Sequence, residues 1–168
     1  MLSVFLAVLA SASVPVPPPI VSVTRPTIVL PAPTPRLAIS RGMVRLYPEE
    51  AVMKAASAAP GFISAVFDFT VRGAAQVGPD FFLNSEEDYR DQRNISAVLG
   101  PDVQRQLRNS FGDDLSKHFV GRHLLVLGPA KRVQIDFIGD DGNRSGKYYY
   151  QTHVAVVDPR QLDLGDPR

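Results

Sequence analysis

The feature that most constrains this chain is a single helical stripe of apolar residues set between segments that alternate like β-strands. In residues 63–71 every odd position is apolar, and the even positions are polar apart from Val66. This period of two indicates a strand with one buried face. In residues 103–119 an apolar side chain recurs at every fourth position, which indicates an amphipathic helix. The stripe consists of Val103, Leu107, Phe111, Leu115 and Phe119.

Three strands are expected before this helix and two after it. The second strand is expected at residues 81–89 and the third at 95–99, and the glycines of residues 73–79 predict the turn that precedes them. Gly112 interrupts the apolar stripe, and Asp113 after it is a favourable N-cap. A kinked helix or two short helices are therefore expected.

The strand pattern resumes after the helix. The fourth strand is expected at residues 121–127, with a bend or bulge at Gly128-Pro129 and a continuation over 133–137. Residues 139–146 are rich in Gly, Asp and Asn and predict a turn. The fifth strand is expected at 148–156.

This order of strand, strand, strand, helix, strand, strand is that of the OB-fold, a five-stranded Greek-key barrel whose helix plugs one end. Short strands with one helix argue against a parallel βαβ sheet. A short helix is expected in front of the barrel at residues 48–58, where Pro48 and two glutamates occupy the first turn. The chain is therefore expected to be mainly β, with the OB-fold domain at 43–164.

The sequence before this domain predicts export. Residues 1–12 combine a short apolar run with small residues, as in a cleavable signal peptide, although they carry no Lys or Arg. An uncleaved anchor or a wrongly assigned start is the alternative. Residues 13–42 hold eight of the fifteen prolines and predict an extended linker. A proline-rich ligand for an SH3-like partner is the other interpretation, and residues 165–168 are expected to be a frayed tail.

Several short motifs occur in a fixed order along the domain. They are Phe82-Leu83-Asn84 followed by Tyr89, then Gly121 and Gly128, then Asp158-Pro159-Arg160-Gln161. In their order and spacing, over about residues 60–164, the chain resembles a family of small bacterial OB-fold domains that are often exported. The resemblance implies the fold and no particular activity. The turn before the fifth strand and the front helix are both longer here than in that family.

The polar corner after the second strand is one candidate site. Its charged and aromatic members include Glu86, Asp88, Tyr89, Arg90 and Arg93. These groups could bind a ligand or an ion at the edge of the barrel. In the structural alternative, which we favour, Asn84 and Ser85 satisfy the backbone where the strand ends. Glu86 and Asp88 could also act as an acid–base pair, but charges beside turns are usually only solvated.

A second candidate group combines Lys131 and Arg132 with three consecutive tyrosines. Interleaved cations and aromatic rings are typical of OB-folds that bind single-stranded nucleic acid. The alternation places Tyr148 and Tyr150 on the inner face and leaves Tyr149 as the exposed ring, and nearby aspartates offset the cations. The candidate ligand-binding residues are therefore Tyr89, Arg90, Arg93, Lys131, Arg132 and Tyr149.

Several kinds of chemistry find no support in the sequence. The chain has no cysteine, which excludes disulfides, thiolate metal sites and cysteine nucleophiles. Its three histidines follow no zinc-ligand spacing. The acidic residues around Asp140 and Asn143 miss the spacing of a calcium-binding EF-hand loop, so a plain turn is the favoured interpretation. We expect no metal and no cofactor, and nucleophile-elbow, HExxH and phosphate-loop motifs are missing.

The sequence therefore predicts a periplasmic or secreted binding or interaction module that is not an enzyme. An envelope protein or a small anionic ligand is the expected kind of partner. The formal net charge of +1 gives no general reason to expect nucleic acid or an anionic membrane. A single-stranded nucleic-acid-binding domain is the alternative function, and a small envelope hydrolase is the second alternative.

Overall fold

The computed structural model describes residues 43–138 and 142–164, which are mainly β structure. The expected signal peptide, the expected linker at 13–42 and the C-terminal tail lie outside the described residues, as do Asp140 and Asp141. Within the described ranges, no helix has both the length and the apolar character needed to cross a membrane.

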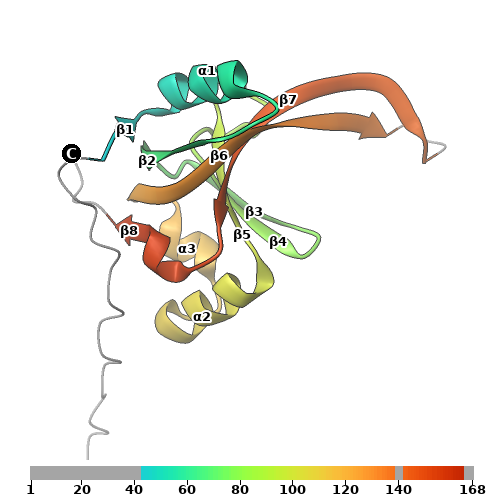
Figure 1. Cartoon of the computed structure of the whole chain (residues 1–168). Helices are drawn as coiled ribbons and strands as arrows, with labels where there is room; N and C mark the ends of the chain where they lie inside the picture. The colour runs from blue at the N-terminus through green and yellow to red at the C-terminus, as the bar shows by residue number, and fades with distance from the viewer. Residues whose placement is uncertain (1–42, 139–141, 165–168) are drawn as a thin grey trace, which may run out of the picture. The chain divides into compact units, whose positions relative to one another are not determined.

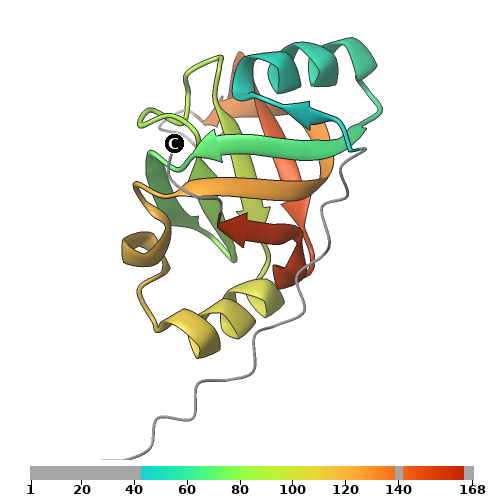
Figure 2. The ribbon, with the colours of Figure 1, turned by 90° about the vertical axis from the view of Figure 1, so that its left-hand side faces the viewer.

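The strands of the described residues form one curled sheet (Figures 1 and 2). Seven of them follow the hydrogen-bonded order β1-β2-β6-β7-β5-β4-β3, and β8 pairs with β6. Figure 2 shows β2, β6 and β8 running side by side. Their bounds are β1 Arg45–Leu46, β2 Ile63–Thr70, β3 Gly73–Val77, β4 Asp80–Asn84, β5 Ile95–Leu99, β6 His123–Ile138, β7 Arg144–Val156 and β8 Leu162–Leu164.

A change of strand partner at Val71 and Arg72 makes the sheet curl. β2 and β3 lie far apart in the sheet order, yet only these two residues separate them in the chain. The Val71 amide donates to the Arg122 carbonyl beside β6, whereas the next amide, that of Arg72, donates to the Asn84 carbonyl of β4, each at 2.9 Å. Successive residues of a strand direct their amides to opposite sides. One nearly continuous strand thus pairs first with β6 and then with β4.

The predicted turn at residues 73–79 is wrong for most of its length. Gly73–Val77 is β3, which pairs antiparallel with β4, so the turn is confined to Gly78 and Pro79. Small side chains at Gly73, Ala74 and Ala75 hide the alternation of this strand. Gly73 is needed for close approach, because a Cβ there would lie 3.2 Å from the Glu86 carbonyl oxygen.

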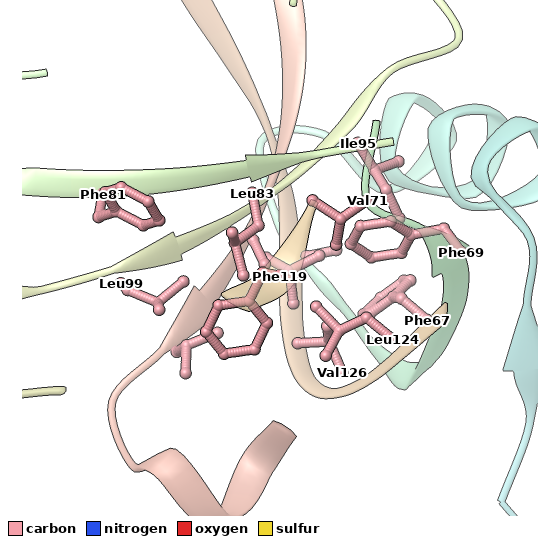
Figure 3. Close-up of a cluster of buried hydrophobic side chains, with 14 of the residues drawn as sticks. Phe67, Phe69, Val71, Phe81, Leu83, Ile95, Leu99, Phe119, Leu124 and Val126 are labelled. Atoms are coloured by element: carbon pink, nitrogen blue, oxygen red, sulfur yellow. The ribbon is translucent and has the colours of Figure 1, made fainter. Parts of the chain in front are cut away.

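The apolar faces of the strands form one core inside the curl (Figure 3). The expected burial of the odd positions in β2 is confirmed for Ala65, Phe67 and Phe69. The opposite face is not simply solvated, because Asp68 is only 2% exposed. The other core side chains labelled in Figure 3 are Val71, Phe81, Leu83, Ile95, Leu99, Phe119, Leu124 and Val126.

Helices lie at two opposite ends of the sheet (Figure 1). The front helix is confirmed as α1 Pro48–Ala58, and the interrupted helix as α2 Pro101–Phe111 and α3 Leu115–Phe119. The residue that caps α3 is Asp114 rather than Asp113, since its carboxylate accepts the Lys117 amide at 2.9 Å. Phe111 is exposed instead of buried, and its ring stacks on His118 at 3.9 Å.

Two predicted strand limits need correction. β4 ends at Asn84, and the chain from 85 to 94 is a loop, so the second strand does not continue to Tyr89. β6 runs without a break from His123 to Ile138, and its register with β2 is regular through Gly128 and Pro129, so it carries no bulge there. Beyond β7, the chain adds the short 3-10 helix η1 Pro159–Gln161 and β8, which the sequence did not predict.

Gly128 is required by close packing against the end of the chain. A Cβ at this position would lie 2.9 Å from both the Ala155 carbonyl oxygen and Gln161 Nε2. The Gln161 amide nitrogen donates to the Leu127 carbonyl at 2.7 Å, and its Oε1 accepts the Val157 amide, also at 2.7 Å. Gly128 and Gln161 thus fasten the last turn of the chain onto β6.

Replacing Gly128 with Ser is expected to lower the free energy of unfolding by about 1–3 kcal/mol, because the Ala155 carbonyl must move. The matched control is Gly100→Ser, whose Cβ meets nothing within 4 Å and whose backbone is extended. Urea unfolding followed by circular dichroism measures both. Equal stability of the two variants would contradict the packing described for Gly128.

Candidate functional site

The loop of residues 85–94 is shaped by the buried side chain of Asn94. Its Oδ1 accepts hydrogen bonds from the Ser85 hydroxyl at 3.3 Å and the Glu86 amide at 3.1 Å, and its Nδ2 donates to the Ser96 hydroxyl at 3.0 Å. A buried amide with satisfied partners fixes the chain around it. Sequence reasoning missed Asn94, which resembles any polar loop residue until the fold brings its partners around it.

This loop is fastened to the outer face of β7. Asn94 Nδ2 and Gln151 Nε2 both donate to the Tyr89 carbonyl, at 3.3 and 3.1 Å. Gln151 Nε2 also donates to the Tyr149 hydroxyl at 3.1 Å. The structure therefore brings Tyr89 and Tyr149 together, two candidate residues 60 positions apart in the sequence.

Arg90 and Arg93 are each engaged by an aspartate of the same loop. The Arg90 guanidinium donates to Asp88 through two nitrogens at 3.0 and 3.1 Å, and that of Arg93 to Asp91 at 3.1 and 2.8 Å. The hydrogen bonds from Arg93 lower the pKa of Asp91 to about 2, and those from Arg90 lower the pKa of Asp88. Both cations are thus largely offset as anion-binding groups.

The hypothetical acid–base pair of Glu86 and Asp88 is divided between two arginines. Glu86 lies 3.5 Å from Arg72, while Asp88 is bound by Arg90. A general acid needs a raised pKa to hold its proton near neutral pH. The pKa of Asp88 is lowered, chiefly by the side-chain hydrogen bond from Arg90, so this carboxylate is poorly suited to that role.

A cavity of about 350 Å³ lies between α1, the loop and β7. We call it the tyrosine cleft. Arg132 and Tyr149, two of the predicted site residues, are part of its lining, and the guanidinium carbon of Arg132 lies 3.5 Å from the centre of the Tyr150 ring. The full lining is Val52, Ala56, Gln92, Arg132, Tyr148, Tyr149, Tyr150, Gln151 and Thr152.

The predicted burial of Tyr148 and Tyr150 is wrong. Their shared face was correctly predicted, since it continues into the buried Thr152 and Val154, but the two rings are 54% and 38% exposed. The reason is strand length. β5 pairs with β7 only from Thr152 onward, so Tyr148 and Tyr150 lie where β7 has passed the end of the core. Tyr149, expected to be the exposed ring, is instead partly buried.

The remaining candidates are dispersed. Tyr89 and Arg90 lie beside Tyr149, whose pKa is raised mainly by burial and then by Tyr89, while Arg90 lowers it. Arg93 lies toward Glu86 and Glu49, whose charges raise its pKa after the dominant hydrogen bond to Asp91. Lys131 is exposed and precedes Arg132 on β6, so it points to the opposite face of the strand.

The face that carries Lys131 is also where β7 places His153. Its ring meets the Phe82 ring edge-on at 5.5 Å between centroids, and its Nε2 lies 2.7 Å from Gln151 Oε1. Burial lowers the pKa of His153, and the charge of Asp80 opposes this only in part. His153 is therefore kept neutral, and it serves to hold Gln151 in place.

A second cavity, of about 600 Å³, lies beside the start of α1. At its wall the buried Asp68 carboxylate is hydrogen-bonded to the His123 imidazole, and Arg45 lies 3.8 Å away. Glu49 and Glu50 also line this cavity. Sequence reasoning missed it, although a charged residue inside the strand pattern at Asp68 was an available signal.

The acidic turn before β7 is only partly described. Asp136 lies 3.1 Å from Arg144, which neutralises it as a cation ligand. Asp140 and Asp141 lie outside the described residues. Across residues 43–138 and 142–164, no group of three or more His, Cys, Asp or Glu side chains is arranged to hold a metal ion.

Comparison with known proteins adds little to this geometry. No protein-family model matches the sequence, and no curated protein is significantly similar to it. Among solved structures, the chain is similar to a protein assigned as an aspartyl-tRNA synthetase from Leishmania major Friedlin, with 12% sequence identity and a TM-score of 0.41. The match covers 79% of this chain and 23% of the other. The observed geometry therefore carries the functional argument.

Proposed function

We propose that this chain is an exported binding module with an OB-fold, and that its ligand occupies the tyrosine cleft. The observation that carries the proposal is the cleft itself, where three tyrosines and Arg132 meet at the end of the barrel. Ligand sites typically combine apolar walls with a few polar groups that fix orientation. Here the walls are Val52, Ala56 and the rings, and Arg132, Gln92 and Gln151 supply the polar groups.

The strand pairing supports the OB-fold. When β2 and β3 are counted as one bent strand and the short β1 and β8 are set aside, five strands remain. Each pair in the order first, second, third, fifth, fourth and first is hydrogen-bonded. The pair of third and fifth strands, β5 and β7, is parallel. The helices α2 and α3 come between the third and fourth strands, the position expected for the OB-fold helix.

The motifs that resemble the bacterial OB-fold family have structural roles consistent with membership. Asn84 Oδ1 accepts the Ser96 hydroxyl at 2.7 Å and so ties β4 to β5. Gln161 requires Gly128 to be small. Neither Asn84 nor Gln161 lines the tyrosine cleft. The resemblance to the family therefore supports the fold, and the residues that would contact a ligand lie outside the motifs.

Single-stranded nucleic acid is a second candidate ligand. The exposed rings of Tyr148 and Tyr150 lie 5.5 Å apart, and Arg132 stacks on one of them. Aromatic rings beside a basic groove are how single strands are bound without sequence preference. The pairing of Arg90 and Arg93 with aspartates leaves few cations for a phosphate backbone, so we rank this candidate below a ligand that needs one positive contact.

Catalysis is not part of the proposal. Glu86 and Asp88 are held by different arginines, and the tyrosine cleft has no carboxylate or histidine in its lining. Of the residue types that move protons or attack substrates in enzymes, the lining offers Thr152 and the tyrosines, without a carboxylate, histidine or lysine to activate them.

Export is expected to leave a mature protein that begins near Ser13. Mass spectrometry of the N-terminus, after expression of the whole chain and fractionation of the cells, measures this. Recovery from the periplasm or medium with Ser13 or a neighbouring residue first agrees with the proposal. An intact Met1 in the cytoplasmic fraction contradicts it.

Ligand binding is expected to move the ring signals of Tyr148 and Tyr150 while those of Tyr47 stay in place. The chain has five tyrosines and no tryptophan, so ¹³C ring labelling gives a small, assignable spectrum. Pools of oligothymidine, cell-envelope oligosaccharides and random 12-residue peptides are the probes. Replacing Tyr150 with Ser is expected to weaken binding of a ligand from any of the pools, and for oligothymidine the lost base stacking is expected to cost roughly 1–3 kcal/mol.

The matched control is Phe62→Ser, which removes an exposed aromatic ring outside the cleft. It should leave the affinity unchanged. If none of the three pools shifts the cleft tyrosines, or if Phe62→Ser and Tyr150→Ser weaken binding equally, the cleft is not the site. Binding of oligothymidine with a steep salt dependence would select the nucleic-acid candidate.

A further inference from the structure

β7 is much longer than the strand beside it. β7 spans Arg144–Val156, whereas its parallel pairing with β5 covers only Thr152 to Val156. Over residues 144–151 the strand pairing recorded for β7 is with β6 alone. Gly146 has φ +78°, which breaks the regular strand near its start, so the regular unpaired edge is residues 147–151.

The tyrosine cleft runs along this edge. Consecutive side chains of a strand point to opposite faces, yet five consecutive residues, 148–152, line the same cavity. A cavity that touches every residue of this stretch follows its backbone, as a cavity beside an unpaired strand edge does. The opposite wall is α1 with Val52 and Ala56, and Gln92 of the loop also lines the cavity.

The backbone along this edge has only part of the usual protection. Every second residue of a strand directs its N–H and C=O groups to the same side, and natural edge strands are commonly blocked by proline, by charged side chains such as lysine, or by a helix or loop that pairs with or covers the edge. Residues 147–151 contain no proline, and Lys147 is their one charged residue. The α1 backbone is bonded within its own helix and cannot supply partners. An extended polypeptide can supply these partners, because it offers alternating N–H and C=O groups at the spacing of a strand.

The charge in the cleft favours an acidic partner. Arg132 contributes the cation, held against the Tyr150 ring, and no aspartate or glutamate contributes to the lining. The nearest acid along β6 is Asp136, which is paired with Arg144. A carboxylate that reaches Arg132 would therefore meet no repulsion inside the cleft.

We propose that the ligand of the tyrosine cleft is an extended polypeptide that adds a strand to β7 at residues 147–151. Its apolar side chains pack against Val52, Ala56 and the tyrosine rings, and one acidic side chain pairs with Arg132. Backbone hydrogen bonds give such strand addition its affinity, and pockets for alternate side chains give its specificity. This inference rests on the proposed function of the cleft and names its ligand class.

The test is selection from a displayed library of random 12-residue peptides on the full chain. Enriched sequences are expected to alternate apolar residues with others, to contain Asp or Glu and to lack proline. Two N-methylated versions of one enriched peptide are then synthesised, one methylated at the odd-numbered residues and the other at the even-numbered residues. The version whose methylated amides would donate to β7 should bind at least tenfold more weakly than the unmodified peptide. The other version should bind less than threefold more weakly.

Charge reversal distinguishes a specific contact of the peptide with Arg132 from a general electrostatic attraction between the peptide and the protein. Arg132→Glu is expected to weaken the acidic peptide at least tenfold, whereas Lys131→Glu, the neighbouring cation on the opposite face, should change affinity less than threefold. If Arg132→Glu does not fold, Arg132→Gln replaces it, and a thermal unfolding curve shows that this variant is folded. Arg132→Gln is expected to lower the affinity for the acidic peptide at least threefold.

Three results would overturn the inference: no enriched consensus, equal binding by both N-methylated peptides, or equal effects of the two charge reversals. If oligothymidine or an oligosaccharide instead binds in a Tyr150-dependent manner, strand addition is wrong and the cleft remains a binding site. If no ligand of any class depends on Tyr150, the proposed function of the cleft fails as well.

Discussion

The structure depends on one exchange of hydrogen bonds, at the point where the first long strand leaves β6 and joins β4. The amides of Val71 and Arg72 are adjacent in the chain but donate to carbonyls on opposite sides, those of Arg122 and Asn84. Because a single strand serves both neighbours, the sheet must curl around the side chains between them. The glycine that follows lets the loop after β4 approach the backbone closely. The curl and the position of this loop therefore share one cause.

The cleft follows from the same arrangement. The loop begins at the end of β4, and its buried Asn94 directs the chain across the outer face of β7 before β5 starts. β5 can consequently pair with only the second half of β7. The first half continues past the core with exposed tyrosines on its inner face, and α1 lies opposite. The cleft thus arises from a mismatch in strand length between β5 and β7.

Apolar patterns predicted β2, β4, β5, β6, β7 and the interrupted helix, because burial of one face is a local signal, and Pro48 with the glutamates after it predicted the front helix. The patterns missed β1, β3 and β8. They failed where the burial of a side chain depends on which other segment of the fold packs against it. Asp68 follows the polar alternation but is buried against His123, and Tyr148 follows the apolar alternation but lies beyond the core. Arg132 and Tyr149 could be predicted as candidate site residues from their chemistry, and both line the tyrosine cleft. That they share a cleft with Gln92 and α1 could not be predicted, since the sequence does not state where β5 stops pairing.

The most direct test of this account is residue-level hydrogen exchange of β7 in the unliganded protein. If the strand leaves β5 at Thr152, amides from Thr152 to Val154, where both neighbouring strands pair with β7, are protected throughout. From 148 to 151, every second amide then exchanges quickly, because only those that face β6 have a partner strand. Uniform protection from 148 to 154 would show that the edge is already occupied, and would contradict a binding site built on an unpaired strand.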